Sequence, residues 1–145
     1  MRKENFTNVT ISYMRRIGEY GIKNMELMEK FKSYLKTKNH FNEEMVLLGI
    51  ALDNPKIVTA DKLRYDVGII NGKSGIEGLE SRNIDDGVYA IFEVEHTIQG
   101  VENFWENILN LTNNLNIDHQ KPILERYTLE KINQHLCEFC IPIKE

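Results

Sequence analysis

The segment from Val88 to Leu115, VYAIFEVEHTIQGVENFWENILNLTNNL, decides the fold. Residues 88–95 are an apolar run of strand length and predict a β-strand. From Val101 onward the apolar side chains recur at helical spacing, which predicts an amphipathic helix. This stripe is the clearest in the chain, and it contains Val101, Phe104, Trp105, Ile108, Leu111, Thr112 and Leu115.

The same order of elements is predicted on both sides of this segment. Two further strands follow the helix, at residues 122–129 and 136–143. The first half of the chain predicts a strand, a helix and two strands, at residues 6–17, 20–36, 44–52 and 63–71. Because the two halves share a pattern rather than residues, we interpret them as a structural repeat.

Each half alone has too few elements to cover its own sheet. We therefore expect one α+β domain over residues 1–145, in which a duplicated strand–helix–strand–strand module forms a mixed or antiparallel sheet with two helices. The half-modules lie at about 5–71 and 87–144, joined by a flexible glycine-rich linker at about 72–86. Related by a pseudo-twofold axis, they would leave a ligand cleft between them.

Composition excludes several classes of protein. The chain has 145 residues, 41% of them hydrophobic, which is enough for one core. Eighteen basic and 22 acidic residues give a net charge of −4, which argues against a direct nucleic-acid binder. The apolar runs are too short to span a membrane, and residues 1–5 show no signal peptide. We expect a soluble cytoplasmic domain.

Two motifs resemble functional sites without satisfying their requirements. Cys137 and Cys140 form a C-x-x-C pair on a predicted strand, where residues three apart point to opposite faces, so a structural role is favoured over a redox pair. Residues 68–74, GIINGKS, have one residue too few for a P-loop and precede no clear helix. The four histidines are scattered. We expect neither a metal nor a cofactor.

Several stretches of the sequence, taken in order, form a recognisable pattern. They are Tyr13–Gly21 (YMRRIGEYG), Gly49–Pro55 (GIALDNP), Leu63–Ile69 (LRYDVGI), Trp105, Glu125-Arg126-Tyr127 and Ile141-Pro142-Ile143. Together they resemble the GyrI-like family, also known as the effector-binding domain of AraC-type regulators. The resemblance covers about residues 5–144, with departures at Thr97, where the family usually has glycine, and at Leu111, where it has an aromatic residue.

The resemblance implies a duplicated module with a ligand cleft between its halves. Members of the family sense small molecules, often amphipathic aromatic cations, and standalone members are linked to drug binding, to protection of DNA gyrase and to hydrolysis of cyclopropane-containing compounds. We expect no helix-turn-helix before the first strand, so a role in transcription would need a DNA-binding partner.

Glu125 is the main candidate for the site. Strand alternation places it on one face with Ile123, Tyr127 and Leu129, and an unpaired carboxylate there would be costly if buried. The residues alone leave open whether this face is solvated. The resemblance favours the cleft, since the matching Glu of the family meets the positive charge of the ligand.

The aromatic candidates each have a plainer alternative. Trp105 lies on the apolar stripe, where a core role is common, but the resemblance places an aromatic residue of this helix against the cleft. Tyr127 could bind Glu125 or stack on a flat ligand, and Tyr13 and Tyr65 could instead pack or face solvent. Arg64 and Asp66 are expected to form surface or sheet-edge ion pairs.

Three functions follow as hypotheses. The favoured one is a small-molecule-binding protein that acts as a sensor, a sequestering protein or an effector domain of a regulator. As a hydrolase, the chain would use Glu125 as general base toward a cyclopropane-type electrophile. As an interaction protein, it would bind a partner such as gyrase or a transcription regulator.

Overall fold

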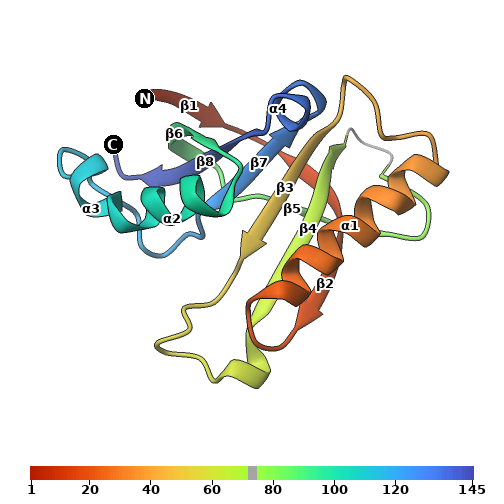
Figure 1. The fold of residues 1–145 in the computed structure, drawn as a ribbon, viewed down its shortest axis with the longest axis horizontal. Coiled ribbons are helices and arrows are strands. Elements are labelled where there is room, and N and C mark those ends of the chain that lie inside the picture. Colours follow the sequence, from red (N-terminus) through yellow and green to blue (C-terminus); the bar gives the residue numbers. More distant parts are fainter. Residues whose placement is uncertain (72–74) are drawn as a thin grey trace.

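The computed structural model describes residues 1–71 and 75–145. Its strands form a single antiparallel sheet in the order β1-β6-β8-β7-β3-β4-β2-β5 (Figure 1). In chain order the elements are β1 (Arg2–Phe6), β2 (Thr10–Ile17), α1 (Ile22–Thr37), β3 (Val46–Ala51), a 3-10 turn η1 (Ala60–Lys62), β4 (Arg64–Asn71), β5 (Glu80–Asn83), β6 (Gly87–Glu95), α2 (Ile98–Glu106), α3 (Ile108–Leu111), β7 (Leu124–Thr128), α4 (Leu129–Asn133) and β8 (Leu136–Ile143).

The predicted repeat is confirmed by the topology. The unit β2-α1-β3-β4 is followed by β6-α2-β7-β8 with the same order of strands and helix. The halves meet where β3 pairs with β7, from Val46 opposite Thr128 to Ile50 opposite Leu124. Outward from this β3–β7 junction the sheet continues as β4-β2 on one side and β8-β6 on the other. The sheet order is thus symmetric about the junction.

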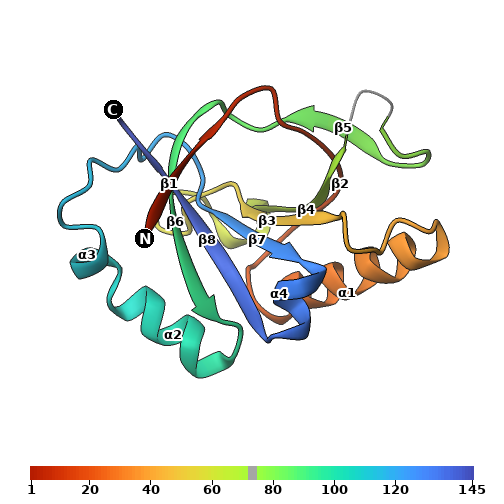
Figure 2. The same ribbon diagram turned by 90° about the horizontal axis from the view of Figure 1, so that it is seen from above.

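Both long helices lie on one face of the sheet (Figure 2). Helix α1 packs on β2 and β4, and α2 packs on β6. Met28, Phe31 and Leu35 are buried at helical spacing on α1, and Phe104 on α2 stacks on Phe139 with ring centroids 4.4 Å apart. Because each helix covers the outer strands of its own half, the two central strands lie between the helices.

The opposite face has its own apolar cluster, which includes Ile11, Leu48 and Leu124. The sheet curves, and the chain around β5 and the β1–β2 connection close over this face (Figure 2). The connection after β5 runs beside residues 8–9, since Ile84 N–H donates to the Val9 carbonyl. Cys137 lies in the cluster on the helix side and Cys140 in this one, so the prediction that their side chains diverge is confirmed.

Four sequence-based expectations about elements are wrong. The strand predicted at residues 6–17 begins only at Thr10, as β2, and a separate strand, β1, that was not predicted precedes it, with Asn8 at a positive φ of 54° between them. The predicted linker contains a strand, β5, which pairs with β2. Residues 72–74, which are the Gly-Lys-Ser of the P-loop-like motif, lie outside the described residues. The stripe from Val101 ends as α2 at Glu106 and resumes as α3, and a short helix, α4, follows β7.

Polar pairing explains why the first of these strands is missed. The segment RKENF of β1 lacks apolar alternation. It is held instead by hydrogen bonding to β6 and by two ion pairs, Arg2–Glu138 at 2.7 Å and Glu4–Arg126 at 2.7 Å.

No helix in the described part of the chain is long and apolar enough to cross a membrane.

Candidate functional site

A pocket of about 540 Å³ opens between α1 and α2, above the β3–β7 junction. The two halves of the repeat contribute to it together, in the position expected for the cleft. Its walls are mainly apolar and its floor carries a carboxyl group and two phenol groups. The lining residues are Asn24, Met25, Met28, Glu29, Lys32, Tyr65, His96, Thr97, Ile98, Val101, Glu102, Glu125 and Tyr127.

Glu125 lies on the floor of this pocket. Strand β7 directs Glu125 and Tyr127 toward the helices and Leu124 toward the opposite apolar cluster. The Tyr127 hydroxyl donates a hydrogen bond of 2.6 Å to Oε2 of Glu125. Within residues 1–71 and 75–145, no Lys, Arg or His side chain forms an ion pair with this carboxylate.

The surroundings of Glu125 disfavour its charge. Burial raises the pKa of its carboxyl group above the ordinary value of 4.5, and the hydrogen bond from Tyr127 opposes that rise only in part. A low-polarity site that holds an anion without a counter-ion is suited to receive a cation, because binding would restore the lost electrostatic stabilisation.

Gly49 makes room on the floor for Tyr65. It lies on β3 directly opposite Glu125 on β7. An ideal Cβ at Gly49 would lie 2.5 Å from the Tyr65 hydroxyl oxygen and 3.7 Å from Cβ of Glu125. The absent side chain therefore allows the phenol of Tyr65 to extend across β3 toward Glu125. The ring of Tyr20 contacts Tyr65 edge-on, with centroids 6.3 Å apart.

The rim of the pocket carries charged groups. Lys32 and Glu29 on α1 form an ion pair of 3.4 Å, and Glu102 lies across the pocket on α2. His96 follows β6 and contacts the Tyr127 ring edge-on, with centroids 5.1 Å apart. Burial, with a smaller contribution from Lys32, lowers the pKa of His96 below its ordinary 6.5, so the imidazole is neutral at pH 7.

The mouth of the pocket is apolar. Met25 is 68% exposed and Ile98 is 81% exposed, and both line the pocket from the first turns of their helices. Thr97 fixes the start of α2, because its hydroxyl accepts a hydrogen bond from the Gly100 N–H at 3.0 Å. Unbranched Met side chains adapt to ligands of different outline, which suits a site with few directional contacts.

The structure brings three of the five predicted site residues together. Glu125, Tyr127 and Tyr65 line the pocket. Trp105 does not: it lies one turn beyond Val101 on α2, is 43% exposed and contacts Phe139 edge-on at 5.3 Å.

Tyr13 is also outside the pocket, since its ring packs with the opposite cluster. The guanidinium groups of Arg15 and Arg82 lie 5.5 and 5.4 Å from its centroid.

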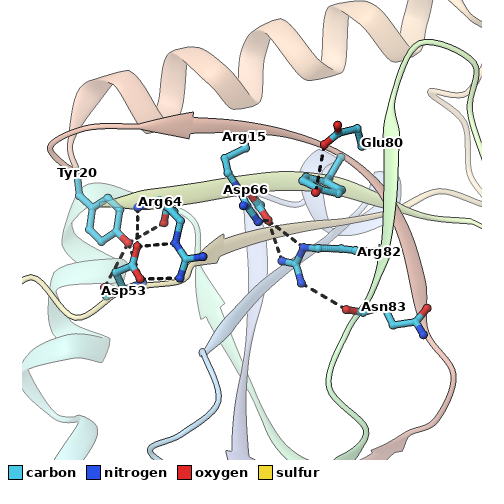
Figure 3. A network of polar contacts seen from close by, with 9 residues as sticks. Arg15, Tyr20, Asp53, Arg64, Asp66, Glu80, Arg82 and Asn83 are labelled. Atoms are coloured by element: carbon cyan, nitrogen blue, oxygen red, sulfur yellow. Dashed lines mark hydrogen bonds and ion pairs between the residues drawn. The ribbon is translucent and has the colours of Figure 1, made fainter. Parts of the chain in front are cut away.

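An ion-pair network on that opposite face corrects another expectation. Asp66 has no exposed surface, and Arg15 on β2 and Arg82 on β5 point toward its carboxylate (Figure 3), at 2.7 Å and 2.8 Å. Asp66 therefore does not form the expected surface or sheet-edge ion pair, because β4 is an interior strand of the sheet and β5 closes over this face. Arg64 does form a partly exposed pair with Asp53, at 2.8 Å.

The prediction missed most of the pocket walls. In the helix predicted at residues 20–36, Met28 recurs at helical spacing with Phe31 and Leu35, but such an apolar stripe does not show which of its residues face a cavity. Glu29 and Lys32 fall on the polar side of that pattern, and His96 has no motif around it. Only the packing of α1 across from α2 shows that these side chains share a site.

Comparisons with known proteins agree with this architecture. The family of GyrI-like small molecule binding domains matches residues 1–144. The chain is 37% identical over 145 residues, 97% of each chain, to YosT of Bacillus subtilis (strain 168), a SPbeta prophage-derived protein named as a candidate transcriptional regulator.

Two solved structures share the fold at low identity. SAV2435 bound to tetraphenylphosphonium has a TM-score of 0.65 at 14% identity, over 99% of this chain and 93% of that one. The C-terminal domain of EcmrR has a TM-score of 0.68 at 8% identity, over 99% and 96%. Together with the family match over nearly the whole sequence, these findings show that the chain belongs to the GyrI-like family of small-molecule-binding domains.

Proposed function

We propose that the protein binds amphipathic aromatic cations in the pocket between α1 and α2, with Glu125 as the counter-charge. The observation that carries this proposal is the Glu125 carboxylate, which lies on the floor of a mainly apolar pocket and forms no ion pair with the described residues. A relative of the same fold, SAV2435, is known bound to tetraphenylphosphonium, a permanent aromatic cation, which supports this ligand class.

Binding would combine three contributions. The first is the burial of apolar surface, which contributes a favourable free energy of roughly 25 cal/mol per Å². The side chains that would cover the ligand are Met25, Met28, Ile98 and Val101. The rings of Tyr65 and Tyr127 can contact a cation for roughly 0.5–2 kcal/mol each. Glu125 would supply charge neutralisation at low polarity. Selection by aromatic surface and charge, with few directional contacts, permits a range of ligands.

The test is calorimetric titration with tetraphenylphosphonium. The Glu125→Gln variant should keep the fold and lose at least about tenfold in affinity, or roughly 1.4 kcal/mol. Glu106→Gln is the matched control, because Glu106 ends α2, is exposed and does not line the pocket. Equal affinity of wild type and Glu125→Gln would overturn the proposal.

The biological role would follow from ligand occupancy. The match to a candidate regulator supports a sensor or effector role in transcription, which the chain would exert through a DNA-binding partner, and the same pocket would also serve a sequestering protein. Co-purification of a DNA-binding protein whose affinity changes with tetraphenylphosphonium would distinguish the sensor from the sequestering role. Binding of gyrase stays a prediction of the resemblance.

The hydrogen-bonded pair of Glu125 and Tyr127 favours hydrolysis as the second candidate. A buried carboxylate with a raised pKa can act as general base, taking a proton from a water molecule and keeping it on the carboxyl group, while the phenol of Tyr127, 2.6 Å away, keeps its own proton and orients the carboxylate. Incubation with a cyclopropane-bearing electrophile separates the two functions. Turnover that is lost in Glu125→Gln would identify an enzyme, whereas binding without turnover supports the sensor.

A further inference from the structure

The floor of the pocket holds one hydrogen-bond donor and one acceptor for which residues 1–71 and 75–145 supply no partner. Among the described residues, the Tyr65 hydroxyl has no hydrogen-bond partner, although the residue is only 6% exposed. From the described part of the chain Glu125 receives one side-chain hydrogen bond, from Tyr127 to Oε2, and none on Oε1. Both groups belong to residues that line the pocket, so a bound molecule can reach both.

These two groups are neighbours. The position of the missing Cβ of Gly49 is 2.5 Å from the Tyr65 oxygen and 3.7 Å from Cβ of Glu125, so the two side chains flank the same point of β3. Burial and the nearby Glu125 carboxylate raise the pKa of the Tyr65 phenol, which therefore keeps its proton and remains a donor. The floor thus presents an O–H donor beside a carboxylate acceptor.

This arrangement discriminates among cations of equal charge. A quaternary ammonium or phosphonium ion offers only carbon-bound hydrogens, so it would displace water from Tyr65 and Glu125 without replacing the hydrogen bonds, which is unfavourable for buried polar groups. A protonated amine donates N–H to the carboxylate in a charge-assisted hydrogen bond. An oxygen two carbons from that nitrogen would accept from Tyr65.

We propose that the pocket selects protonated aryl amines with a hydrogen-bond acceptor close to the nitrogen, such as aryl β-amino alcohols, over quaternary cations of similar size. This inference rests on the proposed function and specifies its ligand class. Glu125 would accept the ammonium N–H on Oε1, Tyr65 would donate to the neighbouring oxygen, and the aromatic body would lie between Met28 and Val101.

Three probes with one naphthyl body test this selectivity by calorimetry at pH 7: 2-(2-naphthyl)ethylamine, 2-amino-1-(2-naphthyl)ethanol, and the N,N,N-trimethyl derivative of the first. Wild type should bind the amino alcohol about tenfold more tightly than the simple amine, and the quaternary ion most weakly. In Tyr65→Phe the advantage of the hydroxyl should disappear, so that the amino alcohol and the simple amine bind this variant with affinities within about twofold of each other.

The control is Tyr34→Phe, since the Tyr34 hydroxyl binds the Glu77 carbonyl at 2.7 Å and the residue does not line the pocket. It should keep the advantage of the amino alcohol. The inference is overturned if the quaternary ion binds wild type as tightly as the amino alcohol, a comparison that needs no variant, or if the hydroxyl advantage persists in Tyr65→Phe.

The outcomes also separate this inference from the proposed function. Equal affinities for all three probes, each reduced by Glu125→Gln, would overturn the selectivity and leave the cation site supported. Affinities that do not depend on Glu125, or no binding of any probe, would overturn both.

Discussion

Gly49 lies directly opposite Glu125 across the junction of the two halves, and its missing side chain is what allows the Tyr65 hydroxyl to extend across β3 toward Glu125. The floor of the pocket is therefore built by three adjacent strands. Strand β4 contributes the phenol, β3 the space, and β7 the acid with its hydrogen-bonding partner Tyr127. The site depends on the pairing of β3 with β7 as much as on any single side chain.

Gly49→Ala should destabilise the protein and weaken cation binding. The added Cβ would lie 2.5 Å from the Tyr65 oxygen, so the ring must shift, and overpacking of this kind costs about 1–3 kcal/mol. Urea unfolding measures the loss. The double variant Gly49→Ala/Tyr65→Phe removes the clashing oxygen and should recover at least half of it. Additive destabilisation in the double variant would show that the contact does not limit this site.

Asp66→Asn should destabilise the fold without changing the pocket. It removes the shared counter-charge of Arg15 and Arg82 on the opposite face. Breaking a fully buried pair costs about 3–5 kcal/mol, and we expect about 2–3 kcal/mol because both guanidinium groups keep partial contact with water.

Chemical denaturation of this variant and of Asp61→Asn, an exposed control on η1, measures the effect. Under conditions where Asp66→Asn remains folded, its affinity for tetraphenylphosphonium should lie within about twofold of the wild-type affinity, since the ion-pair network of Asp66 does not line the pocket. A much larger loss of affinity would mean that the two faces of the sheet are coupled.

Cation affinity should increase with pH. The pKa of Glu125 is raised above 4.5 by burial, so its carboxyl group ionises at higher pH than an exposed Glu, and a permanent cation binds the ionised form better. Affinity for tetraphenylphosphonium should rise from about pH 4.5 through this raised pKa and then level off. Binding below the plateau should also release protons, which titrations in two buffers of different ionisation enthalpy detect.

Raising the pH should have the opposite effect on folding stability, which should decrease. Because the folded-state pKa of Glu125 exceeds the unfolded value, its contribution to stability is fully present below about pH 4.5 and is lost as pH rises through the folded pKa. Glu125→Gln should remove both pH dependences.

Four other titratable side chains line the pocket: Lys32, Glu29, Glu102 and His96. Protonation of His96 below its lowered pKa would reduce cation affinity in the same direction as protonation of Glu125. The variant His96→Gln separates the two contributions. A flat pH profile in wild type would contradict the role of Glu125.

Period-two and helical patterns were enough to predict the repeat and to place Glu125 and Tyr127 on one face of β7, as the structure has them. That this face is turned toward the cleft was predicted by the family resemblance. The polar edge strands β1 and β5 could not be predicted, because hydrogen bonding and ion pairs hold them rather than alternation.

Several residues of the pocket could not be predicted for a similar reason. The family resemblance placed Trp105 at the cleft, but α2 ends at Glu106 and the partly exposed Trp105 packs on Phe139 rather than lining the pocket. His96 and Lys32 reach the pocket only through the distance between two helices that belong to different halves. A local sequence pattern carries no information about that distance.

The position of a bound cation tests the central claim most directly. Tetraphenylarsonium has the shape and charge of tetraphenylphosphonium, and its arsenic atom gives an anomalous signal in a crystal of the complex. We predict one major arsenic peak between α1 and α2, nearer to the carboxylate of Glu125 than to any other carboxylate. A peak outside the pocket, or one inside it that is closer to Glu29 or Glu102 than to Glu125, would contradict the account.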